Sequence, residues 1–453
     1  MAEKLPFSLL IVFALGQLGW SLGSFSVANL LNYFYMPPED AAGNGIFPEY
    51  IPQTALFLTV TWIGLLNFGT RIFDAFTDPL VAYWSDKSES KLGKRSFFLA
   101  LGALPLALFS WLSFMPIESS SSMSNVVWLF FILIVFYIGF SLYVTPFNAL
   151  IAEYGHNSKE RLNISTWISV TWAIGFAIGN QVYGLQAFFQ NRYEMGATQA
   201  FQQSVALLSG IAFLLMLLPV LFIRESRYSI HQKSRENFKE SLLETLRDKN
   251  FRPFLISDLI YWLSLTFIQL GMGYYILVLL ELSPSLLSQM MLILFVLSFV
   301  FYVPINLIAQ RFGKKRLVLF SFFWLSGVFA MAATLSSNSS LGALEQAYAL
   351  TIGASLPLAI FGILPNAIIA DLAQEGERIS GMNRNAMYFG TRTLSMKVGI
   401  SLANLLFPSL LLFGKGIGND LGVRLTAWTA FAFCIIGALV FRMMKEPSHG
   451  QQA

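Results

Sequence analysis

The sequence predicts an all-α polytopic membrane protein with 12 transmembrane helices in two six-helix bundles. Three observations predict this class: an apolar composition, apolar windows that recur along the whole chain, and Lys and Arg residues that concentrate in alternate connections. Of the 453 residues, 55% are hydrophobic and only 12% are charged, whereas about 25% are charged in soluble domains. The composition therefore excludes a water-soluble globule.

Twelve apolar windows of about 19 residues are distributed along the chain. Their centres lie near residues 21, 68, 106, 139, 175, 212, 267, 298, 326, 358, 398 and 432. The first window follows closely on Met1 and stays apolar to Tyr35 without a small-residue cleavage site. We therefore expect a retained first helix rather than a signal peptide.

The basic residues indicate how these helices are oriented. The even-numbered connections hold Lys87, Lys91, Lys94, Arg95, Lys159, Arg161, a cluster from Arg224 to Arg252, Arg311, Lys314, Lys315, Arg316, Arg378 and Arg384. The odd-numbered connections hold only Arg192, Lys415 and Arg424. Because cytoplasmic loops carry the excess of Lys and Arg, we expect a multi-pass protein of the cell (inner or plasma) membrane with both termini in the cytoplasm.

A polar stretch near the middle of the chain divides the windows into two groups. Residues 224–252 mix both charge signs with helical spacing, which favours a cytoplasmic amphipathic linker between an N-terminal bundle, 1–223, and a C-terminal bundle with a short tail, 253–453. The basic turn Gly93-Lys94-Arg95 recurs as Gly313-Lys314-Lys315. This recurrence indicates an internal repeat. The alternative is a chance pair of basic turns that sidedness alone requires.

The second predicted helix contains charges within its apolar window, in the segment GTRIFDAFTDPLVAYW. Arg71, Asp74 and Asp78 lie three and four residues apart and share one helix face, and Pro79 predicts a kink. Placing three such charges in lipid costs roughly 7 to 10 kcal/mol, whereas the apolar residues of the helix return only about 3 to 6 kcal/mol. This face must turn towards partners or water. Two carboxylates one turn apart form an oxygen-rich site suited to Na⁺, Li⁺ or H⁺.

Other ionisable residues also fall within predicted helices. Lys397 lies about 18 Å from the cytoplasmic end of the eleventh helix at 1.5 Å per residue, too deep for its ammonium group to reach the interface. We expect it to exchange charge with the cation site, the alternative being a static ion pair between the two halves. Arg71 and Arg392 either reach the cytoplasmic interface or close an inner gate. Asp258 and Glu153 lie near helix ends, where solvated or capping carboxylates are the favoured interpretation.

The segment R-I-F-D-A-F-T-D-P at 71–79 resembles the second-helix signature of the glycoside-pentoside-hexuronide:cation symporters, the melibiose permease-like branch of the major facilitator superfamily. Further segments agree in order: Asp86 with Gly93-Lys94-Arg95, P-F-N-A-L-I-A-E from Pro146 to Glu153, A-D-L from Ala370 to Leu372, and Lys397. The resemblance spans nearly the whole chain. It implies a major-facilitator fold of two six-helix bundles around a central cavity, with alternating access and cation-coupled uptake.

The resemblance also implies roles for particular residues. In the family the two carboxylates of the second helix bind the coupling cation, which implies a Na⁺ site at Asp74 and Asp78, and Lys397 takes the position of the family's lysine. From their positions in the sequence, and not from the resemblance, we assign Arg71 with Lys397 to the charge pair and Arg392 to the inner gate. The family's sugar-binding positions differ here and are occupied by Ser21, Ile168, Val144 and Asn148.

The expected function is symport of a sugar or glycoside-type solute coupled to Na⁺ or H⁺. The alternative is the Na⁺-dependent symport of lysophospholipids or other amphiphiles that also occurs in this branch. Polar and aromatic side chains within apolar helices are candidates for the substrate cavity. They are Gln17, Asn29, Asn148, Trp172, Gln269 and Asn366. Taken singly, such residues are more typical of interhelical contacts or interface aromatics.

Other functional classes lack the residues that their chemistry needs. The sequence has no G-x-x-x-x-G-K-[ST] motif to power a pump, and His156, His231 and His449 all lie in predicted loops or the tail. One asymmetric cation pocket also differs from the charge rings of a channel. We therefore expect no enzymatic activity, no cofactor beyond the coupling ion and no nucleic-acid partner. We expect a monomer in the lipid bilayer that binds a small-molecule substrate and a cation.

Overall fold

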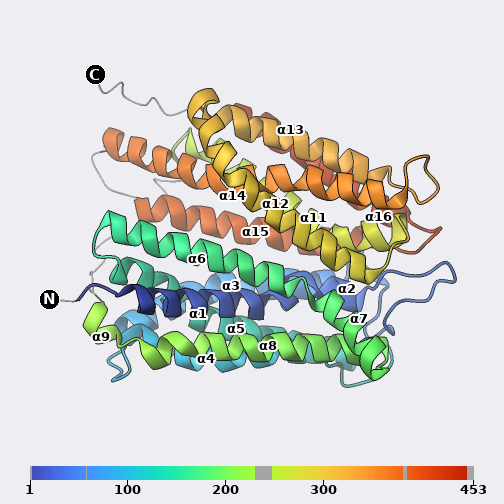
Figure 1. Ribbon diagram of the computed structural model, residues 1–453, viewed down its shortest axis with the longest axis horizontal. Coiled ribbons are helices and arrows are strands. Elements are labelled where there is room, and N and C mark those ends of the chain that lie inside the picture. Colours follow the sequence, from blue (N-terminus) through green and yellow to red (C-terminus); the bar gives the residue numbers. More distant parts are fainter. Residues whose placement is uncertain (1–2, 58, 230–246, 381–384, 446–453) are drawn as a thin grey trace. The chain divides into compact units, whose positions relative to one another are not determined.

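The computed structural model describes residues 3–57, 59–229, 247–380 and 385–445, most of which lie in long helices (Figure 1). Contacts divide the chain into two compact units. The first comprises Met1–Glu39 and Asn44–Ser234, and the second comprises Asp40–Gly43 and Arg235–Ala453. The division falls within the predicted linker, 224–252, whose central part, 230–246, lies outside the described residues.

The first unit is built from antiparallel helices. They are α1 Phe7–Asn29, α2 Leu31–Tyr35, α3 Trp62–Lys87, α4 Lys94–Leu112, α5 Met123–Tyr154, α6 Ser158–Gly179, α7 Val182–Tyr193, α8 Ala197–Phe222 and α9 Glu225–Tyr228. A short antiparallel hairpin, β1 Ala55–Phe57 and β2 Val60–Thr61, precedes α3. Side chains of Thr61, Ser122 and Asn157 cap α3, α5 and α6 by accepting hydrogen bonds from backbone N–H groups of the first turn. These caps explain where the three helices begin.

The second unit repeats this plan. Its helices are α11 Phe251–Tyr274, the π-helical turn η1 Tyr275–Leu279, α12 Pro284–Phe312, α13 Lys314–Ala333, α14 Ala343–Ser380, α15 Asn385–Leu411 and α16 Leu421–Arg442. Tyr261, Phe322 and Phe361 form part of its core, with ring centroids 4.1 Å apart for Tyr261 and Phe361 and 4.7 Å apart for Phe322 and Phe361. In the first unit an aromatic cluster surrounds Phe34 on α2.

Among the described residues, eleven helices are long and apolar enough to cross a membrane. The predicted second helix, α3, is not among the eleven, because Arg71, Asp74 and Asp78 lower its hydropathy. It is nevertheless a continuous helix of 26 residues that runs unbroken through Pro79. With α3, these helices account for the twelve that the sequence predicts, and the all-α polytopic fold class is confirmed.

The repeated basic turn adopts one conformation in both units. Gly93 has φ 112° and ψ 153°, and Gly313 has φ 88° and ψ 145°. Each glycine immediately precedes a helix that begins with a lysine, α4 or α13. Side chains with a Cβ rarely adopt a positive φ, so both turns require glycine. The two turns are therefore alike in backbone as well as in sequence.

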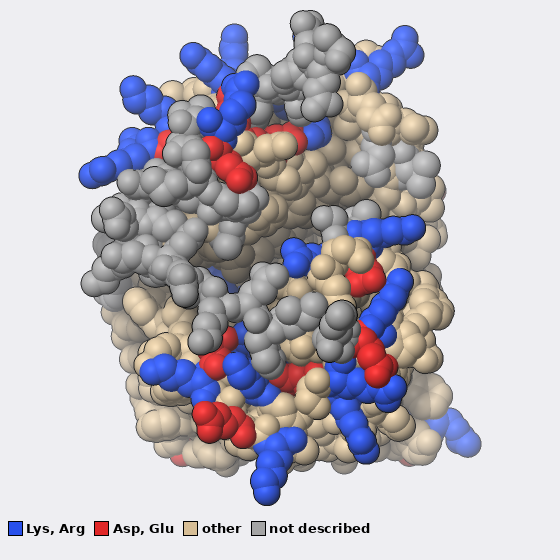
Figure 2. All heavy atoms as spheres, turned by 90° about the vertical axis from the view of Figure 1, so that its left-hand side faces the viewer, with Lys and Arg blue, Asp and Glu red and all other residues tan. Residues whose placement is uncertain are grey.

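Within each unit, Lys and Arg residues gather in alternate connections, at one end of its helices. Figure 2 draws these residues in blue on the face that it views. In the first unit they come from the α3–α4 and α5–α6 connections, and in the second from the start of α11 and the α12–α13 connection. This is the end that we predict to be cytoplasmic.

Candidate functional site

The two carboxylates of α3 meet at a single hydroxyl of α5. Asp74 is 1% exposed. The Ser141 hydroxyl oxygen lies 3.0 Å from Oδ1 of Asp74 and 2.8 Å from Oδ1 of Asp78. A serine hydroxyl has one hydrogen, so it donates to only one of these carboxylates at a time. A proton or cation at this point would lie against both carboxylates.

Two further hydroxyls complete this cluster. Thr145 Oγ1 donates to Oδ1 of Asp78 at 2.9 Å, and Thr77 Oγ1 lies 2.8 Å from the hydroxyl of Ser141. The five side chains form what we call the α3–α5 oxygen cluster: Asp74, Thr77, Asp78, Ser141 and Thr145.

Helical spacing on α5 matches the charged face of α3. Tyr137, Ser141 and Thr145 are spaced by four residues and so share one face of α5. Above the cluster, the Arg71 guanidinium carbon lies 5.7 Å from the centroid of the Tyr137 ring, within the range of a cation–π contact. The charged face of α3 is thus turned onto α5 inside the first unit, away from lipid, as its charge requires.

The donor set of the cluster consists only of carboxylate and hydroxyl oxygens. Such hard oxygen ligands suit alkali cations or a proton, whereas zinc and similar metals prefer His and Cys. Within the described ranges there is no group of three or more His, Cys, Asp or Glu residues placed to hold a metal ion. The residues present therefore fit a monovalent cation better than a tightly held transition metal.

Lys397 lies on α15 in the second unit and is partly buried. Its backbone carbonyl accepts a hydrogen bond of 2.7 Å from the hydroxyl of Ser401. Its predicted exchange of charge with Asp74 and Asp78 joins residues of different units and stays a prediction.

Arg392 forms an ion pair inside the second unit. Its Nε lies 3.1 Å from both carboxylate oxygens of Asp258 on α11, its Nη2 lies 3.0 Å from Oδ1, and its Nη1 donates to Asn366 on α14. The Asp258 side chain is 2% exposed and that of Arg392 is 12% exposed. The expectation of a solvated or capping Asp258 was wrong, because Arg392, 134 residues later in the chain, forms an ion pair with it. The predicted role of Arg392 in an inner gate stays a prediction.

The six cavity candidates differ in what they contact. Gln17 is 1% exposed and donates to Ser21 one turn along the same helix, and Asn29 donates to the Phe25 carbonyl of its own helix. Trp172 packs on Phe176 at 4.5 Å between ring centroids.

The other three candidates lie in different surroundings. Gln269 lines a small apolar pocket inside the second unit together with Tyr261 and Leu294. Asn148 on α5 and Asn366 on α14 are exposed within otherwise apolar spans. Exposed amides are poorly suited to lipid, so these two are the best placed of the six to line a water-filled path.

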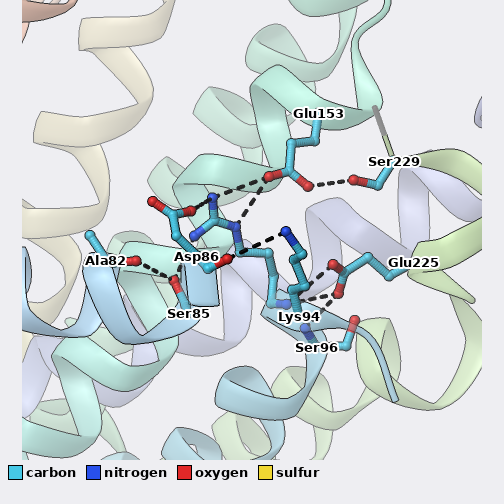
Figure 3. Close-up of polar contacts among 9 residues, drawn as sticks. Ala82, Ser85, Asp86, Lys94, Ser96, Glu153, Glu225 and Ser229 are labelled. Atoms are coloured by element: carbon cyan, nitrogen blue, oxygen red, sulfur yellow. Dashed lines mark hydrogen bonds and ion pairs between the residues drawn. The ribbon is translucent and has the colours of Figure 1, made fainter. Parts of the chain in front are cut away.

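A second charged cluster lies at the basic end of the first unit, where Ser85, Asp86 and Glu153 (Figure 3) contact Arg95. Arg95 Nη2 lies 2.5 Å from Asp86 and 3.2 Å from Glu153, and Nη1 donates to Ser85. Glu153 also accepts a hydrogen bond from Ser229. The expectation of a solvated or capping Glu153 was wrong, since Arg95 and Ser229 enclose it.

Glu225 on α9 anchors the segment that leaves the first unit (Figure 3). Its carboxylate accepts backbone hydrogen bonds of 2.9 Å from Arg95 and 2.8 Å from Ser96, in the first turn of α4. A negative charge at a helix N-terminus is favourable. In the second unit, the ammonium of Lys314, the first residue of α13, lies 2.5 Å from Asp371.

Sequence reasoning missed the hydroxyls of the oxygen cluster. Ser141 and Thr145 lie in a strongly apolar helix and carry no charge. The available signal was the run of Tyr137, Ser141 and Thr145 at intervals of four residues, which is close to the intervals of three and four residues between the charges on α3.

Comparison with known proteins decides the family. Residues 12–444 match the family described as MFS/sugar transport protein. The chain belongs to this family. Membership confirms the predicted resemblance at the family level and indicates a membrane transporter rather than an enzyme.

Curated relatives are distant but include symporters of two kinds. The isoprimeverose transporter of Lactiplantibacillus pentosus is 22% identical over 79% of this chain and 73% of its own. The sodium-dependent lysophosphatidylcholine symporter 1 of Xenopus tropicalis is 22% identical over 69% of this chain and 64% of its own. An uncharacterized symporter of Synechocystis, sll1374, is 29% identical over 41% of this chain and only 31% of its own length.

Solved structures support the fold. The xylose transporter XylE from E. coli, in an inward-open conformation, has a TM-score of 0.68 at 14% identity and covers 98% of this chain and 97% of its own. The nucleoside transporter NupG has a TM-score of 0.66 at 13% identity, over 96% of this chain and 98% of its own. At such low identity these similarities are evidence of the fold only.

Proposed function

We propose that the protein is a secondary transporter that moves a solute by symport with a monovalent cation, Na⁺ or H⁺, bound between Asp74 and Asp78. The single observation that carries this proposal is the position of Ser141, whose hydroxyl lies within 3.0 Å of both carboxylates. Two carboxylates held at one hydroxyl repel each other strongly in a low-dielectric interior. A cation between them offsets that repulsion and draws α3 and α5 together.

Coupling follows from this electrostatic requirement. Without the cation, another positive group must offset the negative charge of Asp74 and Asp78 if α3 is to stay packed on α5. If the solute prefers the conformation in which α3 and α5 are tightly packed, each ligand increases the affinity for the other by the same factor. This reciprocity couples the solute to the cation during alternating access, and both are released together on the cytoplasmic side.

Lys397 is proposed to respond to the same charge. When the cation leaves, its ammonium group offsets the negative charge of Asp74 and Asp78, and when the cation returns, it is displaced. A static ion pair is the competing role. The two differ in outcome: Lys397→Ala abolishes coupled uptake in the first case and lowers only thermal stability in the second.

The proposed solute is a sugar or glycoside. The exposed amide of Asn148 offers hydrogen bonds to hydroxyl groups, and one relative of this chain is an isoprimeverose transporter. The alternative, a lysophospholipid or related amphiphile, is favoured by the similarity to a lysophosphatidylcholine symporter. We further propose a monomer in the cell membrane with both termini in the cytoplasm.

Uptake into proteoliposomes tests the coupling. An imposed inward gradient of Na⁺ or H⁺ should drive accumulation by the unaltered protein, and Asp74→Asn/Asp78→Asn should reduce it to the level of empty vesicles. Glu89→Gln, at an exposed position in the α3–α4 connection, is the matched control and should retain full uptake. Full accumulation by the double variant would overturn the proposal.

Thermal stabilisation tests the solute class. Glycosides and lysolipids are screened against the purified protein with and without Na⁺. Stabilisation by glycosides that depends on Na⁺ supports the sugar proposal, and stabilisation by lysolipids alone supports the alternative.

A further inference from the structure

In the second unit, one face of α15 is bonded to α11 and to Asp248, three residues before α11 begins. Tyr388 donates to Asp248 at 2.6 Å, and Ser395 donates to the carbonyl of Leu255 at 3.1 Å. Each of these partners precedes its residue by 140 positions, so the two helices run parallel and in register.

Two more residues of α15 continue this face. Arg392 pairs with Asp258, as described above. Gly399 lies so close to α11 that a Cβ on it would overlap the carbonyl oxygen of Leu259. We call these four residues the α11-facing seam of α15: Tyr388, Arg392, Ser395 and Gly399.

The seam fixes the rotation of α15 about its own axis. At about 100° per residue, its members cluster within about 60° of one another around the helix. Lys397 lies about 180° from their mean direction, on the opposite face. Because the seam combines an ion pair, two hydrogen bonds and one close backbone approach, a rotation that moved Lys397 would break all four contacts.

We infer that Arg392, Ser395 and Gly399 are positioning residues for Lys397: they hold α15 so that the ammonium group faces away from α11. The effect of this orientation on coupled transport rests on the proposed function. The orientation of Lys397 itself is measured without transport. Arg392 thereby acquires a role that does not require it to touch the solute or the coupling ion.

Gly399→Ala is the direct test. The added methyl group overlaps the Leu259 carbonyl and forces α15 to shift or rotate. Gly390→Ala is the matched control, because it makes the same substitution on the same helix where a Cβ meets no atom within 4 Å.

The readout is the reactivity of a thiol placed at position 397. Cys434 is the one cysteine in the sequence, so Lys397→Cys in a Cys434→Ala background gives a single reporter. Its reaction rate with a charged, water-soluble methanethiosulfonate reagent is measured on the purified full chain in proteoliposomes. Gly399→Ala should rotate α15 and carry the thiol at position 397 towards apolar side chains, where the charged reagent reacts more slowly. The reaction should therefore slow about fivefold in Gly399→Ala and stay unchanged in Gly390→Ala.

An unchanged rate in Gly399→Ala would overturn the inference. If that variant elutes as an aggregate in size-exclusion chromatography, Asp258→Asn/Arg392→Gln replaces it, because this pair removes the ion pair without leaving a lone charge. It should slow labelling in the same direction, and an unchanged rate would again overturn the inference.

Transport separates this inference from the proposed function. In the protein with Lys397 intact, Gly399→Ala should lower cation-driven accumulation more than it lowers counterflow, which requires no net coupling. If the unaltered protein shows no cation-driven uptake but the labelling difference persists, the proposed function is wrong and the inference about Lys397 is supported. If uptake is cation-driven but Gly399→Ala leaves the labelling rate unchanged, the inference about Lys397 is wrong and the proposed function is supported.

Discussion

Thr145 donates a hydrogen bond of 2.9 Å to Oδ1 of Asp78, the same oxygen that lies 2.8 Å from the hydroxyl of Ser141. One carboxylate oxygen of α3 is therefore met by two hydroxyls of α5. The hydroxyls of α5 therefore contribute directly to the surroundings of the acidic residues.

Ser141→Ala should weaken cation dependence. The substitution removes the hydroxyl that both carboxylates share, at a cost of about 1 to 1.5 kcal/mol, so the cation concentration for half-maximal uptake should rise about tenfold. Uptake at varied Na⁺ and varied pH measures this. Ser204→Ala is the control, because its buried hydroxyl bonds only to the Ala200 carbonyl of its own helix. Equal cation dependence in both variants would contradict a ligand role for Ser141.

Arg392→Gln should destabilise the second unit by about 3 kcal/mol, because it leaves the buried carboxylate of Asp258 without its charge partner. Asp258→Asn/Arg392→Gln should recover most of that loss, since both charges are then absent. Thermal unfolding in detergent measures the difference. Equal destabilisation by the single and double variants would show that the pair contributes through packing instead.

Glu225→Ala should lower thermal stability without altering cation dependence. The backbone N–H groups of Arg95 and Ser96 lose their carboxylate acceptor, at a cost of about 2 kcal/mol. Ser226→Ala, at an exposed position on the same short helix, should have no effect. A melting temperature that is the same in both variants would argue against an anchoring role for Glu225.

Asn148→Ala should raise the KM for solute about fivefold and leave the maximal rate unchanged, because it removes a hydrogen bond to the bound solute. Asn404→Ala is the control, since that buried amide donates to the Ile400 carbonyl of its own helix. Initial uptake rates over a range of solute concentrations distinguish the two. A fall in maximal rate with no change in KM would place Asn148 outside the solute path.

The helices and the acidic face of α3 were predictable because bilayer thickness and the cost of charge in lipid act on the sequence locally. The hydroxyls were not, because Ser141 and Thr145 contrast little with an apolar helix. Asp258 and Glu153 were misjudged for a different reason. Their partners, Arg392 and Arg95, lie 134 and 58 residues away in the chain, and only tertiary packing brings each pair together.

The charged face of α3 also has a consequence for biosynthesis. Ser141 is synthesised 67 residues after Asp74, which at 5 to 20 residues per second is a delay of roughly 3 to 13 s. During that interval α3 has left the ribosome without the helix that shields its charges. The insertion machinery must therefore hold α3 out of lipid until α5 arrives, so the order of synthesis is itself a requirement for building the cation site.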